Sequence, residues 1–166
     1  YVCQLIRNDD VNNFIEYIKK NKIKLKSDYF LESRNPTKIE ESIYETNSYL
    51  LQNHYTIDFI EYACFFGSVK IFKYLFMNNI KLHGMLWAPA IHGRNMEIIH
   101  ILEQHGIQPI IGNCGLSDEY RYKECFEIAM KNFHNDIADY ILQFYLQRNV
   151  NQPIPMQPNY QQPFFR

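Results

Sequence analysis

The sequence has little glycine and no excess of charge of either sign. Its 6 glycines are all isolated, so no glycine-rich loop is present to hold a nucleotide phosphate. The 17 basic and 18 acidic residues nearly cancel, which removes the strong positive charge typical of nucleic-acid or anionic-membrane binding. No apolar run approaches the roughly 18 residues of a transmembrane helix. We therefore expect a globular chain whose partner is a protein.

The 4 cysteines are far apart and form no Cys-x-x-Cys motif. A disulfide framework or a zinc site would show closer, patterned spacing. We therefore expect reduced thiols in a cytoplasmic protein, with Cys64 and Cys125 buried beside apolar helix positions. Cys114, in the segment GNCG, has no basic residue near it in the sequence, which argues against a nucleophilic role.

What the sequence does contain is an internal repeat. Three segments align without gaps when Ala63, Ala90 and Ala129 are superposed. The positions eight, twelve and seventeen residues after each alanine are all apolar: Ile71, Leu75 and Ile80; Ile98, Leu102 and Ile107; Ile137, Ile141 and Leu146. A weaker fourth copy places Ile6 at the alanine position and Phe14, Ile18 and Ile23 at the other three. Such a pattern predicts repeats at about 1–23, 58–80, 85–107 and 120–146.

Each copy predicts a helix–turn–helix unit. The second helix would begin at Ser68, Asn95 or Asn135, or at a neighbour of these residues, because such side chains cap helix N-termini. Its apolar residues fall on one stripe, which a single helical hairpin cannot cover, so neighbouring copies must stack. The small alanine lets two first helices approach closely.

Local features support this division of the chain. Asp58 and Glu61 have the spacing of a capping box at the start of a first helix. Pro89 is compatible with the first turn of a helix, where the missing N–H costs little. Between the first two copies, residues 27–54 predict an inserted helical element, with a helix that starts near Thr37. The tail, 147–166, is rich in Pro, Gln and Asn and is expected to be disordered; it could cap the last repeat or bind a partner.

The segments GSVKIFKYLFMNNI and RNMEIIHILEQHGI resemble the second half of an ankyrin repeat. Together with ETNSYLL, LWAPAIHGRNMEIIHILE and YKECFEIAMKNFHNDIADYI, they resemble a large family of uncharacterised ankyrin-like proteins expanded in parasitic single-celled eukaryotes. This resemblance covers about residues 1–145 and implies an all-α, ankyrin-like solenoid of stacked helix–turn–helix units with an interaction role. The Thr-Pro-Leu-His opening of a standard repeat is replaced by DFIEYA, MLWAPA and ECFEIA.

This reading predicts a non-catalytic protein–protein interaction module, with no cofactor, metal or small-molecule substrate. Its concave face would be formed by first-helix residues outside the seam between repeats and by one turn residue: Tyr62, Phe65, Phe66, His92, Lys131 and Arg94. The alternative for Phe65 and Phe66 is that they only complete the core.

The sequence leaves two other function classes open. An enzyme or regulatory subunit would use Cys114 or the histidines, but the cluster His92-Gly93-Arg94-Asn95 is explained by the inter-helix turn, where the other copies have different residues. Glu97 and His100 have a metal-ligand spacing but form only one such pair. Nucleic-acid binding would require a salt-dependent affinity that the charge balance does not predict.

Overall fold

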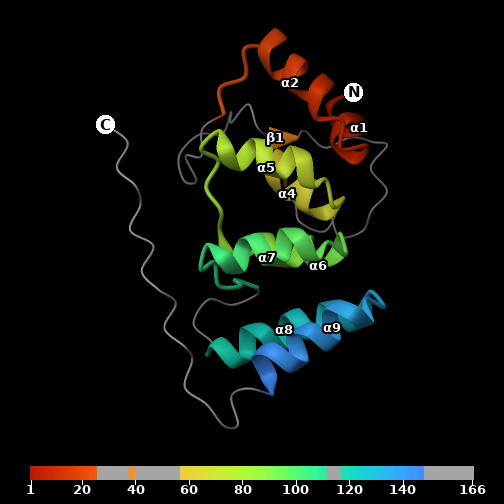
Figure 1. The fold of residues 1–166 in the computed structure, drawn as a ribbon, viewed down its shortest axis with the longest axis vertical. Helices are drawn as coiled ribbons and strands as arrows, with labels where there is room; N and C mark the ends of the chain where they lie inside the picture. Colours follow the sequence, from red (N-terminus) through yellow and green to blue (C-terminus); the bar gives the residue numbers. More distant parts are fainter. Residues whose placement is uncertain (26–37, 40–56, 112–116, 148–166) are drawn as a thin grey trace, which may run out of the picture.

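The computed structural model describes residues 1–25, 38–39, 57–111 and 117–147, and this part of the chain is mostly helical (Figure 1). Its eight α-helices are α1 (Val2–Arg7), α2 (Val11–Lys20), α4 (Phe59–Phe65), α5 (Val69–Met77), α6 (Trp87–His92), α7 (Met96–Gln104), α8 (Asp118–Lys131) and α9 (Asn135–Ile141). A 3-10 turn, η1 (Gly84–Leu86), precedes α6, and a π-helical turn, η2 (Leu142–Leu146), follows α9. Strand β1 (Lys38–Ile39) pairs antiparallel with β2 (Ile57–Asp58).

The helices form four pairs that pack against one another in chain order. The pairs are α1 with α2, α4 with α5, α6 with α7, and α8 with α9. The first helices contact one another in the order α1, α4, α6, α8, and the second helices α2, α5 and α7 do the same. Figure 1 shows the pairs one above another, from α1 and α2 at one end to α8 and α9 at the other. Corresponding residues of neighbouring pairs therefore lie side by side.

The core lies between these pairs, where the sequence predicts it. Ala63, Ala90 and Ala129 are fully buried, so the first helices approach through small side chains as expected. The predicted apolar stripe of the second helices is confirmed in all three aligned pairs, since these residues are also fully buried: Ile71, Leu75, Ile98, Leu102, Ile137 and Ile141. Burying a side chain of this size contributes about 1.5–3 kcal/mol to folding, so the stripe is a main source of stability.

The four inter-helix turns share one backbone geometry. Each contains a residue with a left-handed φ, namely Asp9 (49°), Gly67 (65°), Arg94 (49°) and Phe133 (58°). The amide of the following residue donates to a carbonyl five residues back, as in Ser68 to Ala63, Asn95 to Ala90, His134 to Ala129 and Asp10 to Leu5. This pattern is that of a Schellman helix end, which satisfies carbonyls at the end of the first helix.

The turn geometry corrects the alignment of the first pair by one residue. Leu5, not Ile6, occupies the position of the alanines, because its carbonyl accepts the hydrogen bond from Asp10. Helix α2 has 10 residues, whereas α5 and α7 have 9 each. Because of this extra residue, Ile18 again aligns with Leu75 and Leu102, as the sequence predicts. There the amide of Ile23 donates to Ile18, as Ile80 does to Leu75.

The predicted helix starts are confirmed with two differences in detail. The capping box at Asp58 and Glu61 is present, and Asn95 caps α7 by accepting a hydrogen bond of 3.1 Å from the amide of Ile98. Ser68 occupies the N-cap position of α5, but its hydroxyl donates to the carbonyl of Ile6 instead of capping its own helix. At α9 the N-cap residue is His134, the neighbour of Asn135.

The prediction of a helix that starts near Thr37 is wrong at its first turn. Lys38 and Ile39 are extended and pair with Asp58 and Ile57, so this stretch is a short strand. Pairing with the segment that enters α4 prevails here over the local helical pattern. The remainder of the inserted element, Cys114 with its loop, and the tail from residue 148 lie outside the described residues. Every helix in the part of the chain that the structure describes is too short or too polar to cross a bilayer.

Candidate interaction surface

One position of the first helices carries aromatic and basic side chains in all four pairs. It lies two residues after the alanine position and is occupied by Arg7, Phe65, His92 and Lys131. We call these four residues the first-helix row. Because the first helices pack in order, the row runs across the pairs at the end where the inter-helix turns lie. Phe65, His92 and Lys131 were predicted from the sequence as surface residues.

Arg7 begins the row and contacts two aromatic rings of the next pair. Its guanidinium carbon is 4.9 Å from the ring centre of Phe66 and 5.7 Å from that of Tyr62. Its Nε atom also donates a hydrogen bond of 2.7 Å to the hydroxyl of Tyr62. A guanidinium held over aromatic rings is stabilised by the negative potential of the ring faces. These contacts join the end of α1 to the end of α4.

The aromatic residues at the end of α4 divide between core and surface. Tyr62 is only 2% exposed, so its ring belongs to the core and is not available to a partner, contrary to its predicted place on the concave face. Phe65 and Phe66 are half-buried, with ring centres 5.2 Å apart. Phe65 extends the contact to His92, whose ring centre is 5.5 Å away. These two phenylalanines therefore pack against the core and also contribute to the surface.

His92 is half-buried and held from several sides. Burial lowers its pKa below the usual value, opposed by a hydrogen bond with the Asn132 side chain and reinforced by the nearby His134. The Nε2 atom of His134 lies 3.2 Å from the backbone carbonyl oxygen of His92. These contacts come from the turn between α8 and α9, so they fix His92 between two pairs.

Arg94 and Lys131 form the exposed, charged part of the predicted site. Arg94 Nε lies 3.3 Å from both carboxylate oxygens of Asp136, which links the α6–α7 turn to α9. Lys131, with 77% of its side chain exposed, has its Nζ 3.9 Å from Glu127 on its own helix. Exposed ion pairs of this kind contribute only about 0–1 kcal/mol, so either cation can exchange its carboxylate for one on a partner.

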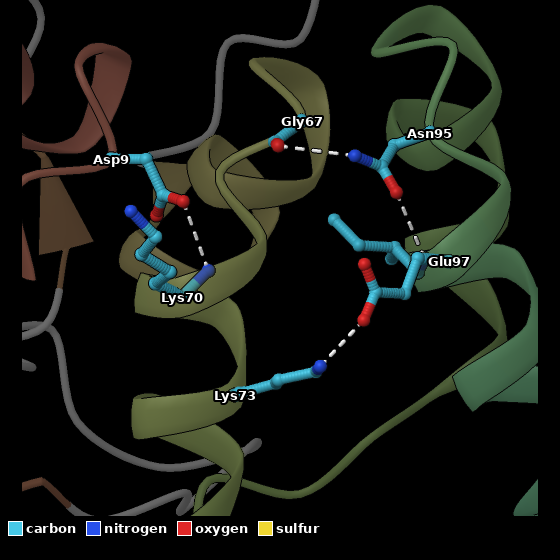
Figure 2. Close-up of polar contacts among 7 residues, drawn as sticks. Asp9, Gly67, Lys70, Lys73, Asn95 and Glu97 are labelled. Atoms are coloured by element: carbon cyan, nitrogen blue, oxygen red, sulfur yellow. Dashed lines mark hydrogen bonds and ion pairs between the residues drawn. The ribbon is translucent and has the colours of Figure 1, made fainter.

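Polar contacts between the turns hold the pairs in register (Figure 2). The Asp9 carboxylate accepts hydrogen bonds from the amides of Lys70 (3.1 Å) and Ile71 (2.9 Å), so it caps α5 from the preceding pair. The Asn95 side chain donates to the carbonyl of Gly67 (3.2 Å) while it caps its own helix. A helix cap contributes about 1 kcal/mol, and here the caps also join neighbouring pairs.

The two candidate metal ligands, Glu97 and His100, have other neighbours. Glu97 forms an ion pair with Lys73 across α5 and α7, and the ring of His100 lies 5.4 Å from that of Tyr140 (Figure 2 shows the Lys73 contact). Among the described residues, no group of three or more His, Cys, Asp or Glu side chains is arranged to hold a metal ion.

Burial and aromatic contacts characterise the described thiols and two further histidines, His83 and His105. Cys64 and Cys125 are buried, as predicted, and burial raises the pKa of both thiols, which favours the unreactive protonated form. Burial also lowers the pKa of His83 to about 4. His105 packs on Phe76, with ring centres 4.7 Å apart. Cys114, on which the enzyme alternative depends, lies outside the described residues.

Arg7 is the member of the row that sequence reasoning missed. The gapless alignment with Ile6 at the alanine position put Asn8 in the row position. The missing signal was Asp10, which caps α2 through the amide of Asn13 and so fixes where the first turn ends. Placing the caps first would have placed Arg7 in the row.

The structure defines a mostly helical chain of packed helix pairs. Searches of protein-family models, curated proteins and solved structures find no match to this chain. Its function is therefore inferred from the described residues themselves.

Proposed function

We propose that this chain is an ankyrin-like helical-repeat solenoid that acts as a non-catalytic protein–protein interaction module. The observation that carries the proposal is the recurrence of one inter-helix turn in all four pairs, with a left-handed residue at the same place in each. Repeats of this kind stack through nearest-neighbour contacts, and their surfaces serve extended binding. The described cysteines form no disulfide with one another, and Cys64 and Cys125 are buried, which fits a cytoplasmic location.

The first-helix row supplies the surface that a protein partner would contact. Its centre is aromatic, through Phe65 and the adjacent Phe66, and its ends carry the cations Arg7 and Lys131. Aromatic side chains and arginine are enriched at protein interfaces, because they combine a large contact area with directional polar contacts. Arg94 lies in the turn after His92, and its exposed ion pair with Asp136 places charged groups next to the row.

A displayed library of random peptides, selected on the intact chain, tests this role without knowledge of the natural partner. The affinities of the enriched peptides are then measured for the double variant Phe65→Ser/Lys131→Glu. We expect a loss of at least about tenfold, the usual effect of removing an interface hot spot. Circular dichroism establishes that the variant keeps its helices.

The matched control is Tyr120→Ser/Lys123→Glu, which makes the same kinds of change at exposed residues of α8 outside the row. It should retain the affinity within about twofold, as expected for residues outside an interface. Equal affinity of the row variant and the unmodified chain would show that the row is not the binding surface.

A further inference from the structure

A dense group of lysines surrounds the end of α2. The chain has a net charge of −1, yet five lysines fall within residues 19–26. The structure describes four of them: Lys19 and Lys20 in the last turn of α2, and Lys22 and Lys24 just beyond it. All four are exposed. Helix α2 is about 15 Å long, so this group is separated by that length from the inter-helix turn and from the first-helix row.

The neighbouring pair adds Lys81 to the four described lysines. The amide of Ile23 donates to Ile18, and that of Ile80 donates to Leu75, so the chain leaves α2 and α5 in the same way. Lys24 and Lys81 follow these two isoleucines and occupy corresponding positions. Since α2 packs on α5, and packed helices have axes about 8–10 Å apart, these two lysines lie at the same end of neighbouring helices. Their potentials therefore add.

We call Lys19, Lys20, Lys22, Lys24 and Lys81 the lysine patch. Among the described residues, no carboxylate forms an ion pair with any of these amino groups, for which the distance limit is 4.0 Å. Stabilisation of the helix dipole accounts for Lys19 and Lys20, because cations favour the last turn of a helix. It does not account for the other three, which lie beyond the helix ends.

An exposed methionine lies at the same end of the neighbouring helix α5. Met77, two residues after Leu75, is 80% exposed and corresponds to Lys20, which lies two residues after Ile18. Methionine adapts its shape to different partners and is enriched at protein interfaces. A cation group with one flexible apolar residue is complementary to a polypeptide that carries acidic and apolar side chains together.

We propose that the lysine patch binds an acidic segment of a partner protein, which places an apolar side chain against Met77. A bilayer fits less well, because the apolar face of α2, with Phe14 and Ile18, is buried and cannot insert. Nucleic acid also fits less well: the described patch contains lysine but no arginine, and so lacks the planar, bidentate group that suits phosphate and base recognition. The patch shares no residue with the first-helix row, so the two proposals fail independently.

The test measures binding of a fluorescent peptide of Asp and Glu with one central Leu, at low salt and at about 0.15 M salt. The triple variant Lys19→Gln/Lys22→Gln/Lys24→Gln should bind at least about tenfold more weakly, because three of the five charges are lost. The control Lys70→Gln/Lys73→Gln/Lys123→Gln makes the same change in net charge elsewhere and should stay within about twofold. Met77→Gln should weaken binding of this peptide but not of a version with Ser in place of Leu.

Three results would overturn the proposal. Equal affinity of the triple variant and the control would show that the patch is not the site. No detectable binding of the peptide to the unmodified chain would do the same. Tighter binding of phosphatidylserine vesicles or of a single-stranded oligonucleotide, lost in the triple variant, would assign the patch to a membrane or to nucleic acid instead.

Discussion

Gly93 is the residue at which a single methyl group should disturb the packing of neighbouring pairs. It ends α6 with an ordinary φ of −71°, so the substitution Gly93→Ala introduces no left-handed strain. A Cβ atom there would lie 2.2 Å from the carbonyl oxygen of Cys64 and 3.0 Å from that of Phe65. Both contacts are with backbone atoms at the end of α4, which cannot rotate away as a side chain can.

The cost of this substitution follows from the geometry. Ordinary contact begins at 3.4 Å, so α4 and α6 must separate locally by about 1 Å. Overpacking of this kind costs about 1–3 kcal/mol. The hydrogen bond from Asn95 to Gly67, 3.2 Å long, spans the same gap and would be lost, which adds about 1 kcal/mol. We expect a decrease of about 2–4 kcal/mol in the free energy of unfolding.

Urea unfolding followed by circular dichroism measures this decrease. Gly106→Ala is the control: a Cβ atom there meets nothing within 4 Å, and only the left-handed φ of 67° opposes it. Its cost should be about 1 kcal/mol, that of a strained backbone without a clash. A Gly93→Ala variant no less stable than this control would refute the close approach of α4 and α6 and, with it, the stacked arrangement of the pairs.

Other substitutions test the core and its titrating groups. Leu102→Ala should lower the free energy of unfolding by about 2–5 kcal/mol through lost burial and a residual cavity, and an unchanged urea midpoint would contradict the register of α7. Cys64 and Cys125 should react with a thiol reagent only as fast as the protein opens, and rapid labelling of either, located by peptide mass spectrometry, would show that it is not buried. Because the pKa of His83 is lowered from 6.5 to about 4, its neutral ring stabilises the fold above pH 6.5 and this contribution is lost as the pH falls toward 4. His83→Gln should therefore flatten the fall of the urea midpoint over that range, whereas an NMR titration of His83 near pH 6.5 would contradict the burial.

The sequence was sufficient to predict the helix pairs and their buried stripe, because the apolar spacing is local and repeats. Ala63, Ala90 and Ala129 were assigned correctly to the close contact between first helices. The segment from Thr37 was mistaken for a helix because its apolar spacing is helical, whereas Lys38 and Ile39 pair with a segment nearly twenty residues away. The local apolar pattern of a sequence does not reveal pairing with a distant segment.

Prediction of the surface was less complete, for two different reasons. Arg7 was missed because α2 has one extra residue. The gapless alignment matched the apolar residues of α2 and thereby shifted α1 by one position, which put Asn8 in the row in place of Arg7. Tyr62 was misplaced because adjacent positions of a short helix differ by about 100° in direction, which separates core from surface within one turn. The lysine patch was overlooked because the net charge of the whole chain averages it with acidic residues elsewhere.

The caps reveal a kind of coupling that no local rule predicts. Ser68 stands where a serine normally caps its own helix, yet its hydroxyl donates to Ile6 in the preceding pair. The amides of Lys70 and Ile71 that it leaves unsatisfied are bound by Asp9, which also belongs to that preceding pair. The start of α5 thus depends on the turn between α1 and α2. Each pair is stabilised where it touches the next, so the spacing of the first-helix row is set by these turn contacts and not by the helices alone.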